Sequence, residues 1–93
     1  MQKLEVGQRI YNGGDQANPS HFGAITAIRD DKWGLKYEVT PDPDDFYPWG
    51  AYWIDAISIS PVYLGHGGTR IVTVEAFEAW HAARMAAFET SAR

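Results

Sequence analysis

Aromatic and acidic residues gather in one short segment in the middle of the chain. Five aromatic rings fall within eight residues, and aspartates flank them. The predicted ligand-binding residues are Phe46, Tyr47, Trp49, Tyr52, Trp53, Asp44 and Asp45, with Asp55 nearby. Ring faces and carboxylates both attract positive charge, so the pattern predicts a surface that binds a protein, a peptide or a small cationic ligand. The alternative is that Trp53 and Tyr52 fill the core, because so small a domain needs large side chains there.

The same region carries most of the negative charge. Residues 30–55 contain seven acidic and two basic side chains, a balance of −5, whereas the whole chain carries −4. Asp30, Asp31 and Asp42 belong to this set. An acidic surface can occupy the basic groove of another protein, which suggests an accessory protein, of phage or mobile-element type, that regulates or inhibits a nucleic-acid enzyme. Solvated turn residues explain the run equally well. Direct nucleic-acid binding is disfavoured, since lysines and arginines do not cluster.

A glycine-rich stretch, residues 65–70, offers a third hypothesis. Its glycines could form an anion-binding nest, with His66 and Arg70 adding positive charge. An enzyme acting on a phosphorylated small molecule could use such a loop. Neither the phosphate-binding nor the dinucleotide-binding glycine motif is present, however, and a plain connecting loop accounts for the glycines as well.

Other chemistry is poorly supported by the residues available. The chain has no cysteine, which excludes disulfides, thiolate zinc sites and cysteine nucleophiles. Its three histidines, His21, His66 and His81, lie in different segments without metal-ligand spacing. We therefore predict no catalytic residue, no metal and no cofactor.

The firmest expected element is an amphipathic helix over about residues 74–89. Thr73 suits its N-cap, and alanines fill much of its length. An apolar stripe runs along it at helical spacing, and Arg84 interrupts that stripe between Trp80 and Phe88. Arg84 either lies over Trp80 with its charge in solvent or belongs to an intersubunit surface. Trp80, Arg84 and Phe88 are thus the predicted interface residues, and a homodimer through this helix is possible.

The remaining chain reads as short strands separated by turns. Leu35, Tyr37 and Val39 alternate with polar residues, as in a half-buried strand. We expect strands over 4–11, 22–29, 35–40, 52–60 and 70–73, a hairpin loop of four or five residues over 30–34, and a bulge or helical turn near Asp55 and Ala56. Ninety-three residues make one domain, with a barrel over about 4–72 before the helix.

The order of these elements resembles the SH3-like small barrels, including the KOW and Tudor-like groups. The resemblance rests on the strand opened by Val6-Gly7-Gln8-Arg9-Ile10-Tyr11, the pattern Gly23-x-Ile25-x-x-Ile28, the hairpin and the strand near 53–59, and it covers about residues 4–60. It implies a five-stranded barrel that binds peptides, nucleic acid or small ligands more often than it catalyses. No site residue of the family can be placed on this sequence.

Taken together, the sequence predicts a mainly β protein with a small SH3-like antiparallel barrel and one C-terminal amphipathic helix, acting as a non-enzymatic binding module. No stretch approaches the roughly 18 apolar residues of a membrane span, and the first residues lack the apolar core of a secretion signal. We expect a cytoplasmic protein that does not bind membranes.

Overall fold

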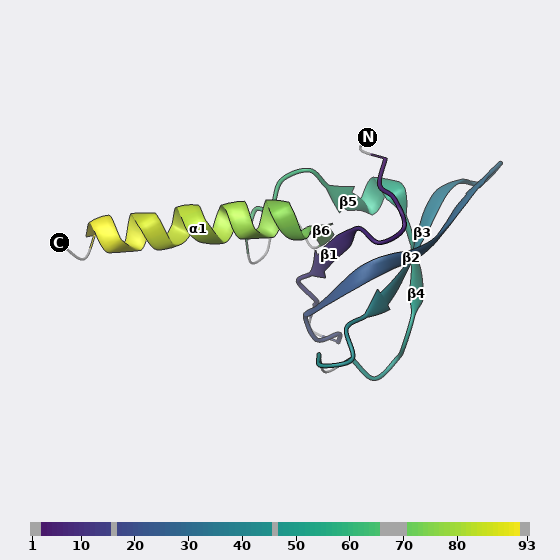
Figure 1. Cartoon of the computed structure of the whole chain (residues 1–93), viewed down its shortest axis with the longest axis horizontal. Coiled ribbons are helices and arrows are strands. Elements are labelled where there is room, and N and C mark those ends of the chain that lie inside the picture. The colour runs from purple at the N-terminus through teal and green to yellow at the C-terminus, as the bar shows by residue number, and fades with distance from the viewer. Residues whose placement is uncertain (1–2, 16, 46, 66–70, 92–93) are drawn as a thin grey trace.

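A curled six-stranded sheet with one long helix makes up the protein in a computed structural model, which describes residues 3–15, 17–45, 47–65 and 71–91 (Figure 1). The strand order is β4-β3-β2-β1-β6-β5, and all neighbours are antiparallel except β5 and β6. The elements are β1 (Arg9–Asn12), β2 (His21–Asp31), β3 (Gly34–Pro41), β4 (Tyr52–Asp55), the 3₁₀ turn η1 (Ala56–Ser58), β5 (Ile59–Ser60), β6 (Ile71–Thr73) and α1 (Val74–Ser91). The mainly β fold with one C-terminal helix is therefore confirmed.

The long hairpin of β2 and β3 forms the middle of the sheet. Asp31 pairs with Gly34, so only two residues make the turn, and the expected loop of four or five residues is wrong. Gly34 has φ of +111°, a value that side chains rarely allow. The register shifts between Ile25 and Ala27, and a bulge of this kind bends a strand. The bend helps the sheet to curl into a half-barrel.

The irregularity expected near Asp55 is the 3₁₀ turn η1, which follows β4 directly. Through this turn the chain passes from one edge strand of the sheet, β4, to the other, β5. β6 then returns between β5 and β1. The curled sheet thus brings its two edges near each other without pairing β4 to β5 among the described residues.

The core fills the inner, concave face of the sheet. Its largest fully buried side chains include Tyr37, Ile10, Ile25 and Val39. Tyr37 satisfies its hydroxyl by accepting a 2.8 Å hydrogen bond from the backbone N–H of Leu4. This bond ties the segment before β1 to the centre of the sheet. The predicted strand over 4–11 is wrong for residues 4–8, which lie outside β1.

Helix α1 packs on the outer face of the sheet by its first turns only. Thr73 caps it as predicted, with its hydroxyl 3.2 Å from the N–H of Ala76. The ring of Phe77 lies 4.2 Å from that of Tyr11 and 5.6 Å from that of Phe22, centroid to centroid. Tyr63, from the segment after β5, packs edge-on against Trp80. These rings form a second, smaller apolar cluster outside the main core.

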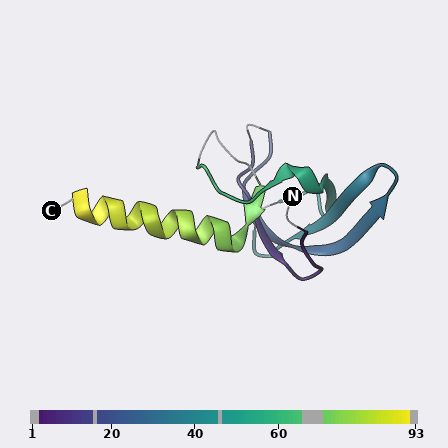
Figure 2. The same cartoon turned by 90° about the horizontal axis from the view of Figure 1, so that it is seen from above.

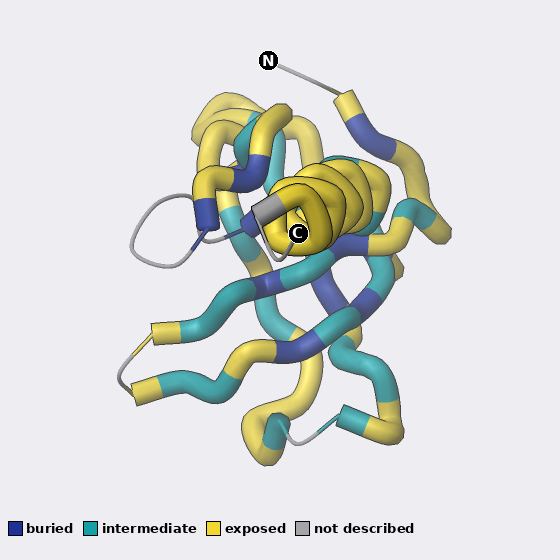
Figure 3. Tube along the Cα trace, turned by 90° about the vertical axis from the view of Figure 1, so that its left-hand side faces the viewer, coloured by how far each residue is buried: buried dark blue, intermediate teal, exposed yellow. Residues whose placement is uncertain are grey.

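The rest of the helix projects away from the sheet. Figure 2 shows the helix projecting away from the strands. From His81 to Thr90 every residue is exposed, and Figure 3, which looks along the helix from its C-terminal end, colours these turns as exposed. An 18-residue helix is about 27 Å long, which explains why the molecule extends 53 Å along its longest axis. No helix in the described part of the chain combines the length and apolar character that crossing a membrane requires.

Candidate functional site

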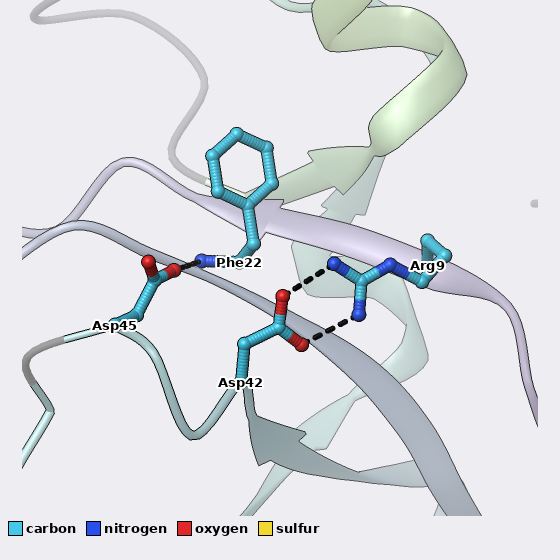
Figure 4. A network of polar contacts seen from close by, with 4 residues as sticks. All are labelled: Arg9, Phe22, Asp42 and Asp45. Carbon is cyan, nitrogen blue, oxygen red and sulfur yellow. Dashed lines mark hydrogen bonds and ion pairs between the residues drawn. The ribbon is translucent and has the colours of Figure 1, made fainter.

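The loop between β3 and β4, residues 42–51, is fastened at its start by two aspartates. Asp42 makes a bidentate ion pair with the guanidinium of Arg9, in which both contacts are 2.5 Å long. The carboxylate of Asp45 accepts a hydrogen bond from the backbone N–H of Phe22 (Figure 4). The hydrogen bond with Arg9 lowers the pKa of Asp42 and raises that of Arg9. Two of the three loop aspartates therefore hold the loop in place, and only Asp44 lies exposed.

A buried polar network supports the middle of this loop. The Nδ1 atom of His21 lies 3.1 Å from the carbonyl oxygen of Pro19, which can only accept, so Nδ1 carries the proton. In the neutral imidazole Nε2 then accepts from the hydroxyl of Tyr52, 2.6 Å away, and that hydroxyl accepts from the amide of Asn12 at 3.1 Å. His21 and Asn12 are each 2% exposed. The network therefore fixes the direction of these side chains from the inside.

Tyr47 and Trp49 stack outward from this network. The ring of Tyr47 lies 4.2 Å from that of His21 and 5.5 Å from that of Tyr52. Trp49 packs edge-on against Tyr47 at 5.3 Å and remains 59% exposed. The loop thus presents a large, supported ring to solvent, with Asp44 on the same loop.

Trp53 points in a different direction from Tyr52. Along β4, Tyr52 and Ile54 pack against the core, whereas Trp53 and Asp55 alternate to the outer face. Trp53 is 41% exposed, and the guanidinium of Arg29 lies 4.6 Å from its ring centroid. The alternative that Trp53 fills the core is therefore wrong. The same alternative is correct for Tyr52, whose ring packs against the core.

A groove of about 510 Å³ lies beside β4. Its lining comes from β4, from η1 and from β6 across the curl of the sheet: Trp53, Ile54, Asp55, Ser58 and Ile71. The carboxylate of Asp55 accepts from the ammonium of Lys36 at 2.5 Å, and 58% of the Asp55 side chain remains exposed. The groove therefore joins an apolar floor to a carboxylate and an indole ring.

The predicted ligand-binding residues thus form two surfaces. Tyr47, Trp49, Asp44 and Asp45 belong to the loop side, which the ring of Tyr52 supports from the core, and Trp53 belongs to the groove side. Phe46 lies outside the described residues, as do His66 and Arg70 of the glycine-rich loop. In the described ranges, no three histidine or acidic side chains come together as a metal site would require.

The predicted interface residues on α1 have different surroundings. Trp80 packs against Tyr63 and closely over Gly65, and the guanidinium of Arg84 lies 5.5 Å from the Trp80 ring centroid. Of the two alternatives for Arg84, the structure shows the position over Trp80, and the intersubunit surface stays a prediction. Phe88 is 67% exposed on the projecting half of the helix. The homodimer through this helix stays a prediction, which light scattering on the whole chain tests.

Three residues that shape the site were missing from the sequence prediction. Asn12 and His21 form the polar network below Tyr47, and Arg9 anchors Asp42 from 33 residues away. No spacing in the sequence marks such contacts, since each joins the ends of different strands.

The chain was compared with protein-family models, with curated proteins and with solved structures. None of them matches it.

Proposed function

We propose that the chain is a non-enzymatic binding module whose 42–51 loop binds a basic protein or peptide, or a small cationic ligand, through Trp49 and Asp44. The observation that carries the proposal is the 59% exposure of Trp49 on a loop that is otherwise fastened. A tryptophan ring can supply a large contact area and attracts cations to its face. Such rings are over-represented among the residues that dominate binding energy.

The supports under Trp49 favour recognition over chance exposure. Its neighbour Tyr47 rests on the buried His21 and on Tyr52, and Asp45 is bonded to Phe22. A ring held in one position loses little conformational freedom when a ligand binds, so more of the contact energy appears as affinity. The exposed carboxylate of Asp44 adds negative charge on the same loop. A positively charged ligand suits both groups.

We further propose that the fold is an SH3-like barrel that is left open between β4 and β5. The curled sheet and the sequential order of β1 to β4 support this proposal. The resemblance implies five strands. This protein has a sixth strand and a projecting helix in addition. Binding modules are common among such small barrels, which agrees with the proposed function.

A selection from a random peptide library tests the function. The whole chain is immobilised, the enriched peptides are synthesised, and their affinities are measured by calorimetry. We expect arginine or lysine in the enriched peptides, and an affinity at least about tenfold lower for Trp49→Ala, or about 1.4 kcal/mol. Trp33→Ala is the matched control, because Trp33 is 75% exposed at the tip of the β2–β3 hairpin. Enriched peptides without basic residues would contradict the proposal. So would peptides whose affinity is unchanged by Trp49→Ala.

A further inference from the structure

The edge of β4 that faces away from β3 offers backbone groups for hydrogen bonding. The N–H of Asp42 donates to the carbonyl of Phe22 at 2.8 Å, which makes Gly23 and Pro41 a pair without mutual hydrogen bonds. The backbone N–H and C=O groups of Thr40 then point toward β2. Since the direction alternates along a strand, those of Val39 and Tyr37 point toward β4.

The same alternation continues into β4. Val39 pairs with Tyr52, and Tyr37 pairs with Ile54, so these two β4 residues direct their N–H and C=O groups toward β3. The N–H and C=O of Trp53 therefore point away from the sheet, along an edge that no strand of the described residues covers. An edge of this kind is a template for a further strand.

The groove lies directly beside this edge. Its volume of about 510 Å³ falls within the usual range of ligand pockets, about 300–1,000 Å³. A strand added to β4 would direct alternate side chains to one face, as any strand does. One of them could enter the groove, whose lining includes Ser58 and Ile71 besides residues of β4.

The lining selects the chemistry of that side chain. Ile54 and Ile71 suit an aliphatic stem, while Asp55 and the Trp53 ring suit a positive head group. The guanidinium of Arg29 already lies 4.6 Å from the Trp53 ring centroid, so an incoming cation would share this ring with Arg29. Lys36 bonds Oδ1 of Asp55, and 58% of the Asp55 side chain remains exposed to a second cation. The segment 30–55, to which Trp53 and Asp55 belong, carries a formal balance of −5. Lysine and arginine match these features best.

We propose that β4 binds an extended basic peptide as an added strand, with a lysine or arginine side chain of the peptide seated in the groove. This inference rests on the proposed function of a binding module, and it adds a second surface, the β4 edge with its groove, beside the 42–51 loop. Main-chain hydrogen bonds to Trp53 provide affinity, and the groove provides selectivity for the basic residue.

Amide hydrogen exchange measured by NMR tests the added strand. The probe is a short acetylated peptide of alternating valine and threonine with one central arginine. In the free protein we expect the Trp53 amide to exchange faster than those of Tyr52 and Ile54. Saturating peptide should slow exchange at Trp53 at least about tenfold, because a hydrogen-bonded amide exchanges only when the bond opens. N-methylation of alternate peptide nitrogens should abolish binding, and Asp55→Asn should weaken it at least about fivefold.

The outcomes separate this inference from the proposed function. A peptide that binds and depends on Trp49, yet leaves exchange at Trp53 unchanged, overturns the added strand and leaves the proposed function standing. Protection of Trp53, whether or not it is sensitive to Trp49→Ala, supports the added strand, and the role of the loop is decided separately by the library-selected peptides. If the probe peptide shows no binding at a concentration of about 1 mM, its dissociation constant is well above that value. This result overturns the added strand.

Discussion

The Nε2 atom of His21 lies 2.6 Å from the hydroxyl oxygen of Tyr52, although 31 residues separate them in the chain. This contact joins the start of β2 to the start of β4. Tyr47 packs on both rings, so the position of the 42–51 loop depends on it. The surface that carries Trp49 is in this way built on a buried polar network.

Removing the Tyr52 hydroxyl should therefore destabilise the fold. Tyr52→Phe takes away the group that donates to His21 and accepts from Asn12, both of which are buried. A buried polar group deprived of a partner costs about 1–3 kcal/mol in the free energy of unfolding. Urea unfolding measures the loss. Tyr47→Phe is the control, because it keeps the ring on His21 and leaves this network intact; an equal loss in both variants would contradict the role of the network.

The ion pair of Arg9 and Asp42 should make stability depend on pH. The pKa of Asp42 is lowered from its ordinary value of 3.8, so the folded state favours the ionised carboxylate. Its contribution is present above that value and declines as the pH falls through the lowered pKa. Because Arg9 is about half exposed and solvent screens the pair, the contribution is about 0.5–1 kcal/mol at most.

Asp42→Asn checks this prediction in urea unfolding at two pH values. We expect the variant to be less stable than the wild type at pH 7, and the difference to shrink in strong acid. Asp44→Asn is the matched control from the same loop, since Asp44 is exposed. A stability difference for Asp42→Asn that persists unchanged in acid would show that the ion pair is not its cause.

Two phenylalanines of α1 should differ sharply in their contribution to stability. Phe77 packs against Tyr11, Phe22 and Tyr63, whereas Phe88 is 67% exposed. A buried phenylalanine replaced by alanine costs about 3–5 kcal/mol, and the half-buried Phe77 should cost about 2–3 kcal/mol. Phe88→Ala should change the free energy of unfolding by less than about 0.5 kcal/mol. Similar losses in the two variants would mean that the helix packs differently from the structure.

Gly23 should tolerate no side chain. A Cβ atom there would lie 2.7 Å from the carbonyl oxygen of Thr40 and 3.1 Å from the Val39 side chain. The first neighbour is backbone of the adjacent strand, so the hairpin would have to shift. Overpacking of this kind costs about 1–3 kcal/mol, which thermal unfolding of Gly23→Ala measures. Gly7→Ala is not an equivalent control, because Gly7 has φ of +96°. Ala24→Gly serves instead, since it adds no atoms at the neighbouring position; an unchanged melting temperature for Gly23→Ala would be inconsistent with the close approach.

Local patterns in the sequence predicted much of the fold. The alternation of Leu35, Tyr37 and Val39 identified β3, and Thr73 with the following alanines identified the start of α1. The bulge or helical turn expected near Asp55 and Ala56 is the 3₁₀ turn η1, which begins at Ala56. Each of these features depends on neighbouring residues, which is why sequence alone could predict them.

The arrangement of the site depended on contacts that no local pattern contains. The sequence prediction put Tyr52 and Trp53 in one cluster, yet adjacent residues of a strand face opposite sides of the sheet. Which of the two faces the core depends on the pairing of β4 with Val39 and Glu38 of β3. The run of aspartates resembled a uniform acidic surface. Two of them are instead bonded to Arg9 and Phe22, partners that only the fold brings near.

The most direct test measures binding and stability in the same Trp49→Ala preparation. The account predicts that affinity for a library-selected basic peptide falls at least about tenfold. It also predicts that the melting temperature stays within about 3 °C of the wild type, because a shift of about 4–8 °C corresponds to 1 kcal/mol in a domain of this size. A melting temperature lowered by about 10 °C or more, with peptide affinity unchanged, would assign Trp49 to the folded core and contradict its role in recognition.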